Sequence, residues 1–411
     1  MKPRRDLVLI GNFLPDRQES MQRFAGVLSD GMAARGWNVQ SWRPRARFAN
    51  LAGKYRYGGI PKYLGYLDKF FVFPRSIQRR QHIAATPETI YHIVDHSNAV
   101  YAAYLPPQHL TITCHDLLQI RSALGEFPQH RVSASGRRYQ EWILNNLKKV
   151  QRAVCISGKT RSDVQRLAGL NAEQTPVIYM GLNYPYKPMA KASAADVLRP
   201  CCDRHGDTWA RLQSGKNGYI LGVGGAHWYK NRTGLVSIFA ELQKFPEAPS
   251  RLLYVGPPLD LEQTAILKQH GLENAFLRIS GVSNEELRAA YSLSRGLLFP
   301  SWEEGFGWPI AEAQACGCPV FTSNREPMTE IGGDAAVYVD PADAPGAARI
   351  IHESFASLAP RIERGLANVA RWSTAAMLDA YEQHYETMIQ KRDEGAPAEL
   401  SALIQTRKSN G

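Results

Sequence analysis

Two glutamates, Glu304 and Glu312, stand eight positions apart around a segment with two glycines. The residues between them read Gly-Phe-Gly-Trp-Pro-Ile-Ala, and the proline suits the start of a helix over Pro309–Ala315. Each carboxylate oxygen can accept a hydrogen bond from a hydroxyl, and glycines let the backbone approach a ligand closely. Amides at a helix start suit an anion or a group of hydroxyls. The segment can therefore bind a sugar, although either glutamate alone more often lies in solvent or complements the helix dipole.

A second glycine-rich segment, Leu221–Asn231, follows another apolar run. Its residues read Leu-Gly-Val-Gly-Gly-Ala-His-Trp-Tyr-Lys-Asn. A dinucleotide-binding fingerprint would need glycine or alanine at the position of His227, so the match to an NAD-binding loop is weak. A cation at Lys230 could instead stabilise the negative charge on a departing diphosphate. The alternative is an ordinary solvated lysine.

Polar residues also follow two predicted strands in the first half of the chain. His115, in Thr113–Leu117, stands directly after one apolar run. It is either a site residue or a histidine satisfied within the core. His92, Asp95 and His96 end the preceding run, and they either meet a substrate or cap a turn.

Short apolar strands alternate with helices along most of the chain, which predicts parallel βα units with both faces of each sheet covered. The first series of expected strands comprises Leu7–Ile10, Trp37–Trp42, Thr89–Val94, Leu110–Cys114 and Val154–Ser157, with helices at Ser20–Arg35 and Arg137–Val150. The second comprises Tyr219–Gly222, Arg251–Gly256, Leu277–Ser280, Gly296–Pro300, Val320–Thr322 and Ala336–Val339, with helices at Thr233–Gln243, Asp260–His270, Glu285–Ser292 and Pro309–Ala315.

Two such series predict an α/β protein of two doubly wound, Rossmann-like domains, whose strands end at a central cleft. We expect the first domain over residues 1–190 and the second over residues 191–372. Pro185–Asn217, with several prolines and small residues, is expected to be a linker with a variable helical stretch. Residues 373–411 include a helix with Tyr381 and Tyr385 on one side, which we expect to pack back on the first domain.

The segment Pro300–Val320 resembles the E-x7-E motif of retaining GT-B glycosyltransferases of family 4, the glycosyltransferase group 1 type. Glu330–Pro341 is similar to a second segment typical of that family, so the resemblance is specific. It implies the GT-B architecture, in which the first domain binds the acceptor and the second binds a nucleotide sugar.

The resemblance also implies roles for individual residues. The catalytic residues would be Lys230 at the donor diphosphate, Glu304 at hydroxyls of the donor sugar, and His115, the histidine of an HD pair, facing that sugar. The donor-binding residues would be Glu312 at the nucleotide ribose, the amides of Phe306, Gly307 and Trp308 along the sugar, Val282 at the nucleobase, and Gly225 and Asn231 beside the lysine.

Two positions depart from the family pattern. The arginine expected five or six residues before the lysine is replaced by glycines, one of them Gly225. Either His227 or Arg232 could supply a second positive charge, or Trp228 and Tyr229 could reshape the pocket. The loop after the first strand has a single early glycine, Gly11, where the family has paired glycines. The resemblance therefore does not extend donor contacts to that loop, although Gln22 and Arg23 could reach the cleft.

The net charge of +11 is unevenly distributed. Residues 1–190 hold 27 Lys and Arg against 12 Asp and Glu, whereas the remainder holds 22 against 26. The first half should therefore face an acidic partner. Basic and aromatic residues alternate in Lys54–Arg80, which favours an anionic membrane surface or, equally, an amphipathic pair of helices with core aromatics. The aromatic residues are Tyr55, Tyr57, Tyr63, Tyr66, Phe70, Phe71 and Phe73.

Nothing in the sequence indicates secretion or a membrane span. The apolar run after Met-Lys-Pro-Arg-Arg is short and leads to Asp16 without a cleavage site. No stretch approaches the roughly 20 apolar residues of a spanning helix. The six cysteines form no metal-binding spacing, which favours reduced thiols. We expect a cytoplasmic protein that is either free or peripheral at the inner face of a membrane.

With the resemblance, the sequence predicts an enzyme without a cofactor that moves a hexose from a GDP- or UDP-sugar with retention. The acceptor would be a hydroxyl of a glycan or lipid-linked oligosaccharide in surface polysaccharide or glycolipid biosynthesis. The sequence has no Asp-x-Asp metal motif, so Lys230 and amide dipoles, rather than a metal ion, should stabilise the leaving group. An NAD-dependent oxidoreductase is the alternative. Nucleic acid is not an expected partner, because the basic residues form no recognisable binding motif.

Overall fold

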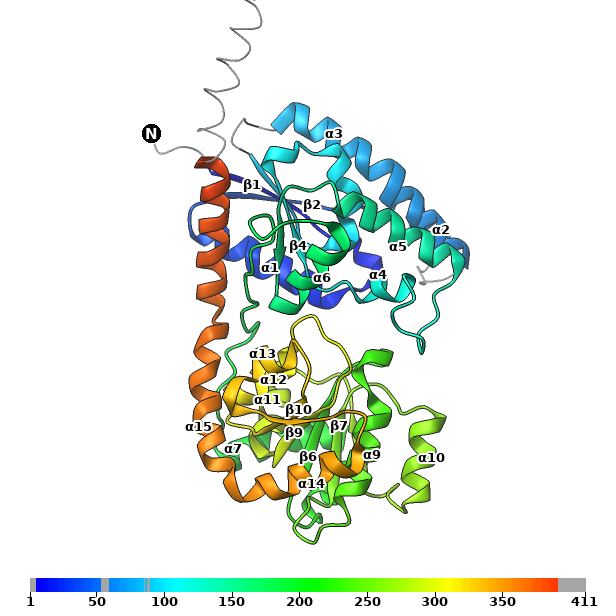
Figure 1. Ribbon diagram of the computed structural model, residues 1–411, viewed down its shortest axis with the longest axis vertical. Coiled ribbons are helices and arrows are strands. Elements are labelled where there is room, and N and C mark those ends of the chain that lie inside the picture. Colours follow the sequence, from blue (N-terminus) through cyan, green and yellow to red (C-terminus); the bar gives the residue numbers. More distant parts are fainter. Residues whose placement is uncertain (1–4, 53–58, 85, 87–88, 391–411) are drawn as a thin grey trace, which may run out of the picture. The chain divides into compact units, whose positions relative to one another are not determined.

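The chain forms two compact units in a computed structural model that describes residues 5–52, 59–84, 86 and 89–390. Unit 1 consists of Met1–Tyr179 together with Thr374–Gly411, and unit 2 consists of Met180–Ser373. Each unit contains one parallel sheet flanked by helices (Figure 1). The two predicted series of strands are thus confirmed as two parallel sheets, one in each α/β unit.

The sheet of unit 1 has five parallel strands in the order β2-β1-β3-β4-β5. Every residue of β1 and β4 is buried, because a parallel sheet is covered on both faces. The edge strand β2 differs: its sequence, Asn-Val-Gln-Ser-Trp, is mostly polar, and only its tryptophan is buried. The strands are β1 (Asp6–Ile10), β2 (Asn38–Trp42), β3 (Ile90–Ile93), β4 (Leu110–Cys114) and β5 (Ala153–Cys155).

The helices of unit 1 bury one face each. In α1 the buried residues are Phe24, Leu28 and Met32, four positions apart, as the helical spacing predicts. In the described part of the chain, none of the helices is both long and apolar enough to span a bilayer. The helices are α1 (Glu19–Ala34), α2 (Gly59–Leu67), the π-helical segment η3 (Asp68–Val72), α3 (Phe73–Ala84), α4 (Leu118–Ala123), α5 (Ala134–Leu147) and α6 (Gly158–Ala168), with shorter 3-10 segments η1 (Leu14–Asp16), η2 (Ala49–Ala52), η4 (His96–Tyr104) and η5 (Pro107–His109).

The last described helix, residues 374–390, belongs to unit 1. The hydroxyl of Tyr385 lies 2.6 Å from Nδ1 of His92, and Nε2 of that histidine lies 2.7 Å from the hydroxyl of Thr113. The Thr113 hydroxyl is also 2.9 Å from that of Tyr381. All four side chains are fully buried. His92 therefore neither meets a substrate nor caps a turn; it is a core residue of β3 that fastens this helix to the sheet.

The sheet of unit 2 has six parallel strands in the order β11-β10-β9-β6-β7-β8. Its core includes Ile220, Leu252 and Phe321 from the strands and Val236 and Ile351 from helices, all 1% exposed or less. The strands are β6 (Tyr219–Val223), β7 (Arg251–Val255), β8 (Phe276–Ile279), β9 (Gly296–Phe299), β10 (Val320–Ser323) and β11 (Val337–Val339).

Two helices occupy much of the stretch Pro185–Asn217 that the sequence suggested as a linker. The first of them, α7, packs against α11 and buries Leu198, Cys201 and Cys202. The stretch is therefore largely part of unit 2. The helices of unit 2 are α7 (Lys191–Asp203), α8 (Thr208–Gln213), the 3-10 turn η6 (Trp228–Lys230), α9 (Arg232–Leu242), α10 (Leu261–Gln269), α11 (Asn284–Leu293), α12 (Trp308–Ala315), α13 (Met328–Gly332), η7 (Gly333–Ala335), α14 (Ala344–Ser354), η8 (Phe355–Ser357), α15 (Leu358–Asn368) and η9 (Val369–Trp372).

Candidate active site

The strand order of unit 2 reverses at the centre of its sheet. From β6 the chain moves outward through β7 and β8, then returns to β9 on the other side of β6 and moves outward through β10 and β11. The loops after β6 and β9 therefore diverge at the carboxyl end of the sheet, where doubly wound folds bind their ligands. These two loops contain Lys230 and Glu304.

Lys230 and Glu304 form an ion pair across this reversal. Nζ of Lys230 lies 2.7 Å from Oε1 and 2.9 Å from Oε2 of Glu304. Both side chains are mostly buried, with 17% and 7% of their surface exposed. The ammonium also lies over the rings of Tyr229 and Phe299, at 5.5 and 5.3 Å from the centroids. The structure thus brings together a cation suited to a diphosphate and a carboxylate suited to hydroxyls.

Asn231, next to this lysine, fixes the loop after β6. Its backbone is left-handed, with φ of 47°, a conformation that asparagine tolerates better than most residues. Its Oδ1 accepts from the N–H of Gly234 at 3.0 Å and so caps α9. Its Nδ2 donates to the carbonyls of Pro300 at 2.9 Å and Pro341 at 3.2 Å. One buried side chain therefore ties together the ends of β6, β9 and β11.

Asn231→Ala should lower the free energy of unfolding by about 2–4 kcal/mol, because a helix cap is lost and two carbonyls lose their donor. Asn217→Ala is the matched control, since Asn217 has a similar φ of 56° but is exposed and donates to two carbonyls at 3.3 Å. Urea unfolding should show a loss of about 1 kcal/mol for the control. Equal losses in the two variants would contradict the anchoring role.

The loop after β9 leads into α12 through a glycine with a left-handed backbone. Gly307 has φ of 93° and is the residue before the first turn of the helix, where amide N–H groups lack helical acceptors. Phe306 is buried edge-on against Trp372, with ring centroids 5.5 Å apart. The amide of Trp302 donates to the carbonyl of Tyr229 at 2.7 Å and so joins this loop to the one after β6. The backbone of Phe306, Gly307 and Trp308, rather than the Phe306 side chain, is therefore the part suited to a ligand.

Glu312 lies in α12 and is only 8% exposed. Its Oε2 accepts a hydrogen bond from the hydroxyl of Tyr291, in α11, at 2.9 Å. Burial, and then the neighbouring Glu312 charge, raise the pKa of Tyr291 well above its usual value, so the phenol stays a donor. The role of Tyr291 was not predicted from the sequence, because no local pattern in an amphipathic helix indicates which distant residue a tyrosine will contact.

The remaining predicted donor residues lie in loops at the same end of the sheet. Gly225 follows β6, and a side chain there would meet Nδ1 of His227 at 3.2 Å. Val282 follows β8 and comes after Gly281, whose φ is 65°. Ser283 then caps α11 by accepting from the N–H of Glu286. These turns offer main-chain groups to a ligand.

Arg232, one of the two candidates for the second positive charge, is engaged elsewhere. Its guanidinium donates to the carbonyl of Pro258 at 2.7 Å and lies 3.8 Å from Asp260. These contacts hold it on the loop between β7 and α10. His227, the other candidate, stacks on the ring of Tyr229 with centroids 5.3 Å apart. Neither residue is paired with Glu304 as Lys230 is.

Unit 1 has its own reversal, between β1 and β3. Nδ2 of Asn12, after β1, donates to Asp95, after β3, at 2.5 Å. Asp95 also accepts from the amide and hydroxyl of Ser97, at 3.0 and 2.6 Å, and so caps η4. Burial opposes ionisation of Asp95, but nearby His96 and these hydrogen bonds hold its pKa below the usual value. Asp95 therefore caps a turn, which is one of the two roles that the sequence allowed for it.

His115 is 4% exposed and lies directly after β4. Its Nε2 lies 2.9 Å from the carbonyl of Val94, so this nitrogen carries the proton and donates it. Burial lowers the pKa of His115, although Asp95 opposes the shift. The imidazole is therefore neutral near pH 7 and presents Nδ1 as an acceptor. Its core contact with Phe24, at 5.1 Å between ring centroids, fixes the ring orientation.

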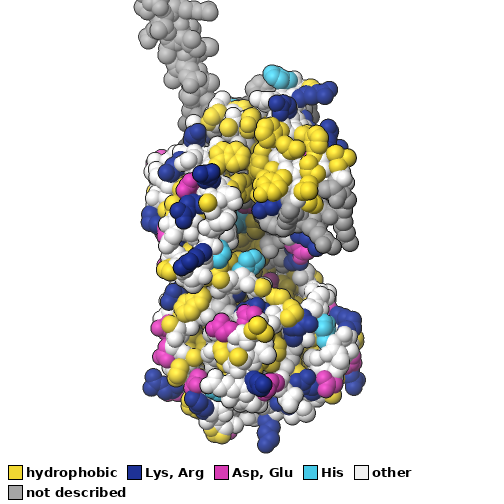
Figure 2. Space-filling view, turned by 90° about the vertical axis from the view of Figure 1, so that its right-hand side faces the viewer, with side chains coloured by type: hydrophobic (Ala, Val, Ile, Leu, Met, Phe, Trp, Pro, Cys, Tyr) yellow, Lys and Arg dark blue, Asp and Glu magenta, His cyan; other side chains and the backbone are white. Residues whose placement is uncertain are grey.

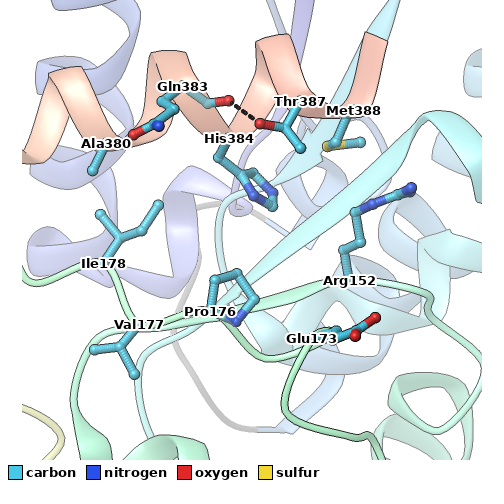
Figure 3. Close-up of a pocket in the computed structure, with 10 residues that line it drawn as sticks. All are labelled: Arg152, Glu173, Pro176, Val177, Ile178, Ala380, Gln383, His384, Thr387 and Met388. Atoms are coloured by element: carbon cyan, nitrogen blue, oxygen red, sulfur yellow. Dashed lines mark hydrogen bonds between the residues drawn. The ribbon is translucent and has the colours of Figure 1, made fainter. Parts of the chain in front are cut away.

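His115 lines neither of two pockets found in unit 1. One, of about 220 Å³, lies between α1 and the ends of β1 and β2, and Gln22 and Arg43 line it with Gly11 and Asn12. The other, of about 330 Å³, lies beside the helix of residues 374–390, with His384 pointing into it (Figure 3). None of the predicted catalytic or donor-binding residues lines either pocket.

Three histidines with lowered pKa values should make the stability of unit 1 sensitive to acid. Burial lowers the pKa of His92, of His115 and of His384, the last to about 4. In the unfolded chain histidine has a pKa near 6.5. Below that pH the unfolded state therefore binds protons at histidines that stay neutral in the folded state. Stability should therefore fall as the pH drops, by roughly 2 kcal/mol between pH 6.5 and 5 for His384 alone.

Urea unfolding at pH 7.5 and pH 5 measures this loss. His384→Gln should reduce the difference between the two pH values, whereas His270→Gln, on the exposed end of α10, should leave it as in the wild type. The explanation fails if the two variants show the same pH dependence.

Comparisons with known proteins agree with these features. The family described as Glycosyltransferase Family 4 matches residues 21–184, and that described as Glycosyl transferases group 1 matches residues 207–356. O-antigen chain mannosyltransferase B of Escherichia coli is 28% identical over 298 residues, which cover 68% of this chain and 72% of that protein. Serotype-specific mannosyltransferase WbdA of Escherichia coli is 24% identical over 353 residues, covering 78% of this chain but only 39% of that protein.

Solved structures share the fold. Sucrose-phosphate synthase from Thermosynechococcus elongatus matches with a TM-score of 0.71 at 19% identity, covering 94% of this chain and 100% of that one. Anabaena HepE in complex with UDP and glucose matches with a TM-score of 0.66 at 16% identity, covering 93% and 100%. The predicted GT-B architecture is thus confirmed. With both halves of the sequence matched by family patterns, the chain is a glycosyltransferase and belongs to the GT-B glycosyltransferases of family 4, the group 1 type.

Proposed function

We propose that the protein transfers a hexose, with mannose as the first candidate, from a nucleoside-diphosphate sugar to a hydroxyl of a glycan or lipid-linked oligosaccharide. Both Escherichia coli relatives are named mannosyltransferases, and one is named for the O-antigen chain, which supports a role in surface polysaccharide biosynthesis. The observation that carries the proposal is the ion pair of Lys230 with Glu304 at the strand reversal of unit 2.

In the proposed reaction the bond between C1 of the sugar and the diphosphate oxygen breaks, and the acceptor oxygen bonds to C1 on the same face. The acceptor proton passes to an oxygen of the leaving phosphate, so the anomeric configuration is retained without a protein nucleophile. Lys230 and the amides at the start of α12 stabilise the charge that develops on the diphosphate. Because these groups supply the charge, we propose that no divalent ion is needed.

The donor would rearrange the ion pair on entering. Lys230 would turn to the diphosphate, and Glu304, released from it, would accept hydrogen bonds from sugar hydroxyls. Glu312, oriented by Tyr291, would accept from the ribose. The main chain at Val282, Gly225 and Asn231 would complete the donor site, and neutral His115 would accept from a hydroxyl of the sugar through Nδ1.

We also propose that the nature of the acceptor determines where in the cell the protein acts. An oligosaccharide on a lipid carrier is confined to a bilayer, so an enzyme that extends it has to work at that surface. A cytoplasmic enzyme, peripheral at the inner face of the membrane, fits a nucleotide-sugar donor and such an acceptor.

The test is a panel of GDP- and UDP-sugars incubated with the full chain, with and without a membrane lipid extract, while release of the nucleoside diphosphate is followed. We expect slow hydrolysis of one sugar nucleotide, faster turnover with the extract, and no change when EDTA is added. Proton NMR of the product should show the anomeric configuration of the donor. Selective binding of NAD in calorimetry, with no binding of any sugar nucleotide, would favour the oxidoreductase alternative instead.

A further inference from the structure

One face of the helices between β2 and β3 exposes apolar side chains to solvent. Ile60, Tyr63, Leu67 and Phe71 are 73%, 68%, 39% and 57% exposed. They stand three or four positions apart along α2 and η3, so they form one stripe on a continuous helical surface. Figure 2 shows hydrophobic side chains gathered on this side of unit 1. We call these four residues the apolar stripe.

The opposite side of the same helices supplies the contacts with the rest of unit 1. Phe73 is buried edge-on against Tyr101 at 4.9 Å, and Phe70 meets Trp142 of α5 at 5.0 Å. Tyr66 stacks on Tyr139 at 6.2 Å. The interpretation as core aromatic residues is therefore confirmed for Phe73, whereas Tyr63 and Phe71 lie in the exposed stripe. Tyr55 and Tyr57 lie outside the described residues.

Neighbouring elements extend the stripe. Leu51 on η2, which packs beside α2, is 77% exposed, and Phe48 just before it is 41% exposed. Trp142, whose ring meets Phe70, is 42% exposed. The side chains of the stripe and its extensions are thus apolar groups that the packing of unit 1 leaves largely exposed. Such a group of side chains on a soluble domain indicates an interaction surface.

The segment that carries the stripe is strongly basic. Residues 43–84 contain ten Lys and Arg and a single acid, Asp68. Asp68 is 1% exposed and accepts from the amides of Arg47, Phe48 and Ala49, so it does not present its charge at the surface. Among the cations, Arg45, Arg47, Arg75 and Arg79 are exposed, whereas Lys69 is buried and paired with Asp16 at 2.7 Å. On α5, the exposed acid next to Trp142 is Glu141.

We propose that the apolar stripe docks unit 1 on an anionic lipid surface. Aliphatic and aromatic side chains would enter the boundary between headgroups and acyl chains, and the surrounding arginines would meet the negative headgroups. A second copy of the chain fits less well, because a two-fold interface would place the same cationic rim against itself. A nucleic acid also fits less well, since Ile60 and Leu67 offer no ring to stack on bases. Docking would bring the enzyme to a lipid-linked acceptor, a consequence that rests on the proposed function.

The test is cosedimentation of the full chain with vesicles of phosphatidylcholine alone or mixed 7:3 with phosphatidylglycerol. We expect the wild type to bind the anionic vesicles about ten-fold better than the neutral ones, less so at high salt. Leu67→Ser with Phe71→Ser should weaken that binding about ten-fold. Leu261→Ser is the matched control, because Leu261 is 91% exposed but lies on α10 of unit 2.

The docking would be overturned if the wild type stayed in the supernatant, or if the stripe variant bound the vesicles as well as the control does. It would also be overturned if the wild type were a dimer, the stripe variant were a monomer, and neither of them bound vesicles. Circular dichroism confirms that the variants are folded. Hydrolysis of the sugar nucleotide in solution is measured in parallel and should be equal in all variants. Vesicle binding without any such hydrolysis would support the docking proposal and contradict the proposed function. The two proposals can therefore fail separately.

Discussion

Lys230→Ala is expected to lower turnover at least about a thousand-fold with the fold intact, because a fixed cation at the departing diphosphate is worth several kcal/mol in the transition state. The charge on the diphosphate grows only as the glycosidic bond breaks, so the loss should fall on kcat rather than on KM for the donor. Initial rates over a range of donor concentrations separate the two constants. Lys244→Ala is the matched control: Lys244 contacts Glu241 at 2.6 Å, much as Lys230 contacts Glu304, but it is 63% exposed.

The buried partner of the lysine makes a second variant necessary. Glu304 is only 7% exposed in the wild type, and Lys230→Ala removes the cation that lies 2.7 Å from it. An unpaired buried carboxylate is destabilising, so a loss of activity could reflect a disturbed loop. Lys230→Ala combined with Glu304→Gln removes that charge and should recover thermal stability without recovering turnover. Recovery of turnover in the double variant would show that the lysine only stabilises the loop.

The strands could be predicted from the sequence closely, for a physical reason. Strands buried on both faces, such as Leu7–Ile10 and Leu110–Cys114, are unbroken apolar runs bounded by polar or small residues, and the structure places both within one residue of the expected ends. The helix α7 gave a weaker signal, since its apolar positions are few and Pro200 lies within it. Its burial depends on α11, which lies far along the chain, and no local pattern encodes that contact.

The candidate site was foreseeable where residue type and spacing carry the chemistry. Lys230, Glu304 and Glu312 were named from the sequence, but the contacts that these side chains make were not. Lys230 pairs with Glu304 because the strand order brings their loops together. Tyr291 pairs with Glu312 because α11 packs against α12. Both contacts join residues that are distant in the chain. The same holds for Asn231, whose anchoring contacts come from the ends of two other strands.

Glu312→Ala is expected to weaken donor binding about a hundred-fold while changing kcat little. A hydrogen bond between a buried carboxylate and a ribose hydroxyl is worth about 2–3 kcal/mol, and it is made equally in the ground and transition states. This pattern is the opposite of the one expected for Lys230→Ala. Calorimetry with the nucleoside diphosphate measures it without any acceptor.

A ligand lacking the ribose hydroxyls tests the contact directly. The wild type should lose most of its affinity for the 2′,3′-dideoxy nucleoside diphosphate, whereas Glu312→Ala should bind the two ligands almost equally, because the interaction is already absent. Tyr291→Phe should lie between them, since the carboxylate stays but loses the hydroxyl 2.9 Å away that orients it. Tyr219→Phe removes another buried hydroxyl, bonded to the carbonyl of Ala290 at 2.6 Å, and should keep the wild-type preference. If Glu312→Ala still discriminated between the ligands as the wild type does, the ribose would have to be bound elsewhere, and the carboxylate would serve only to hold Tyr291 between α11 and α12.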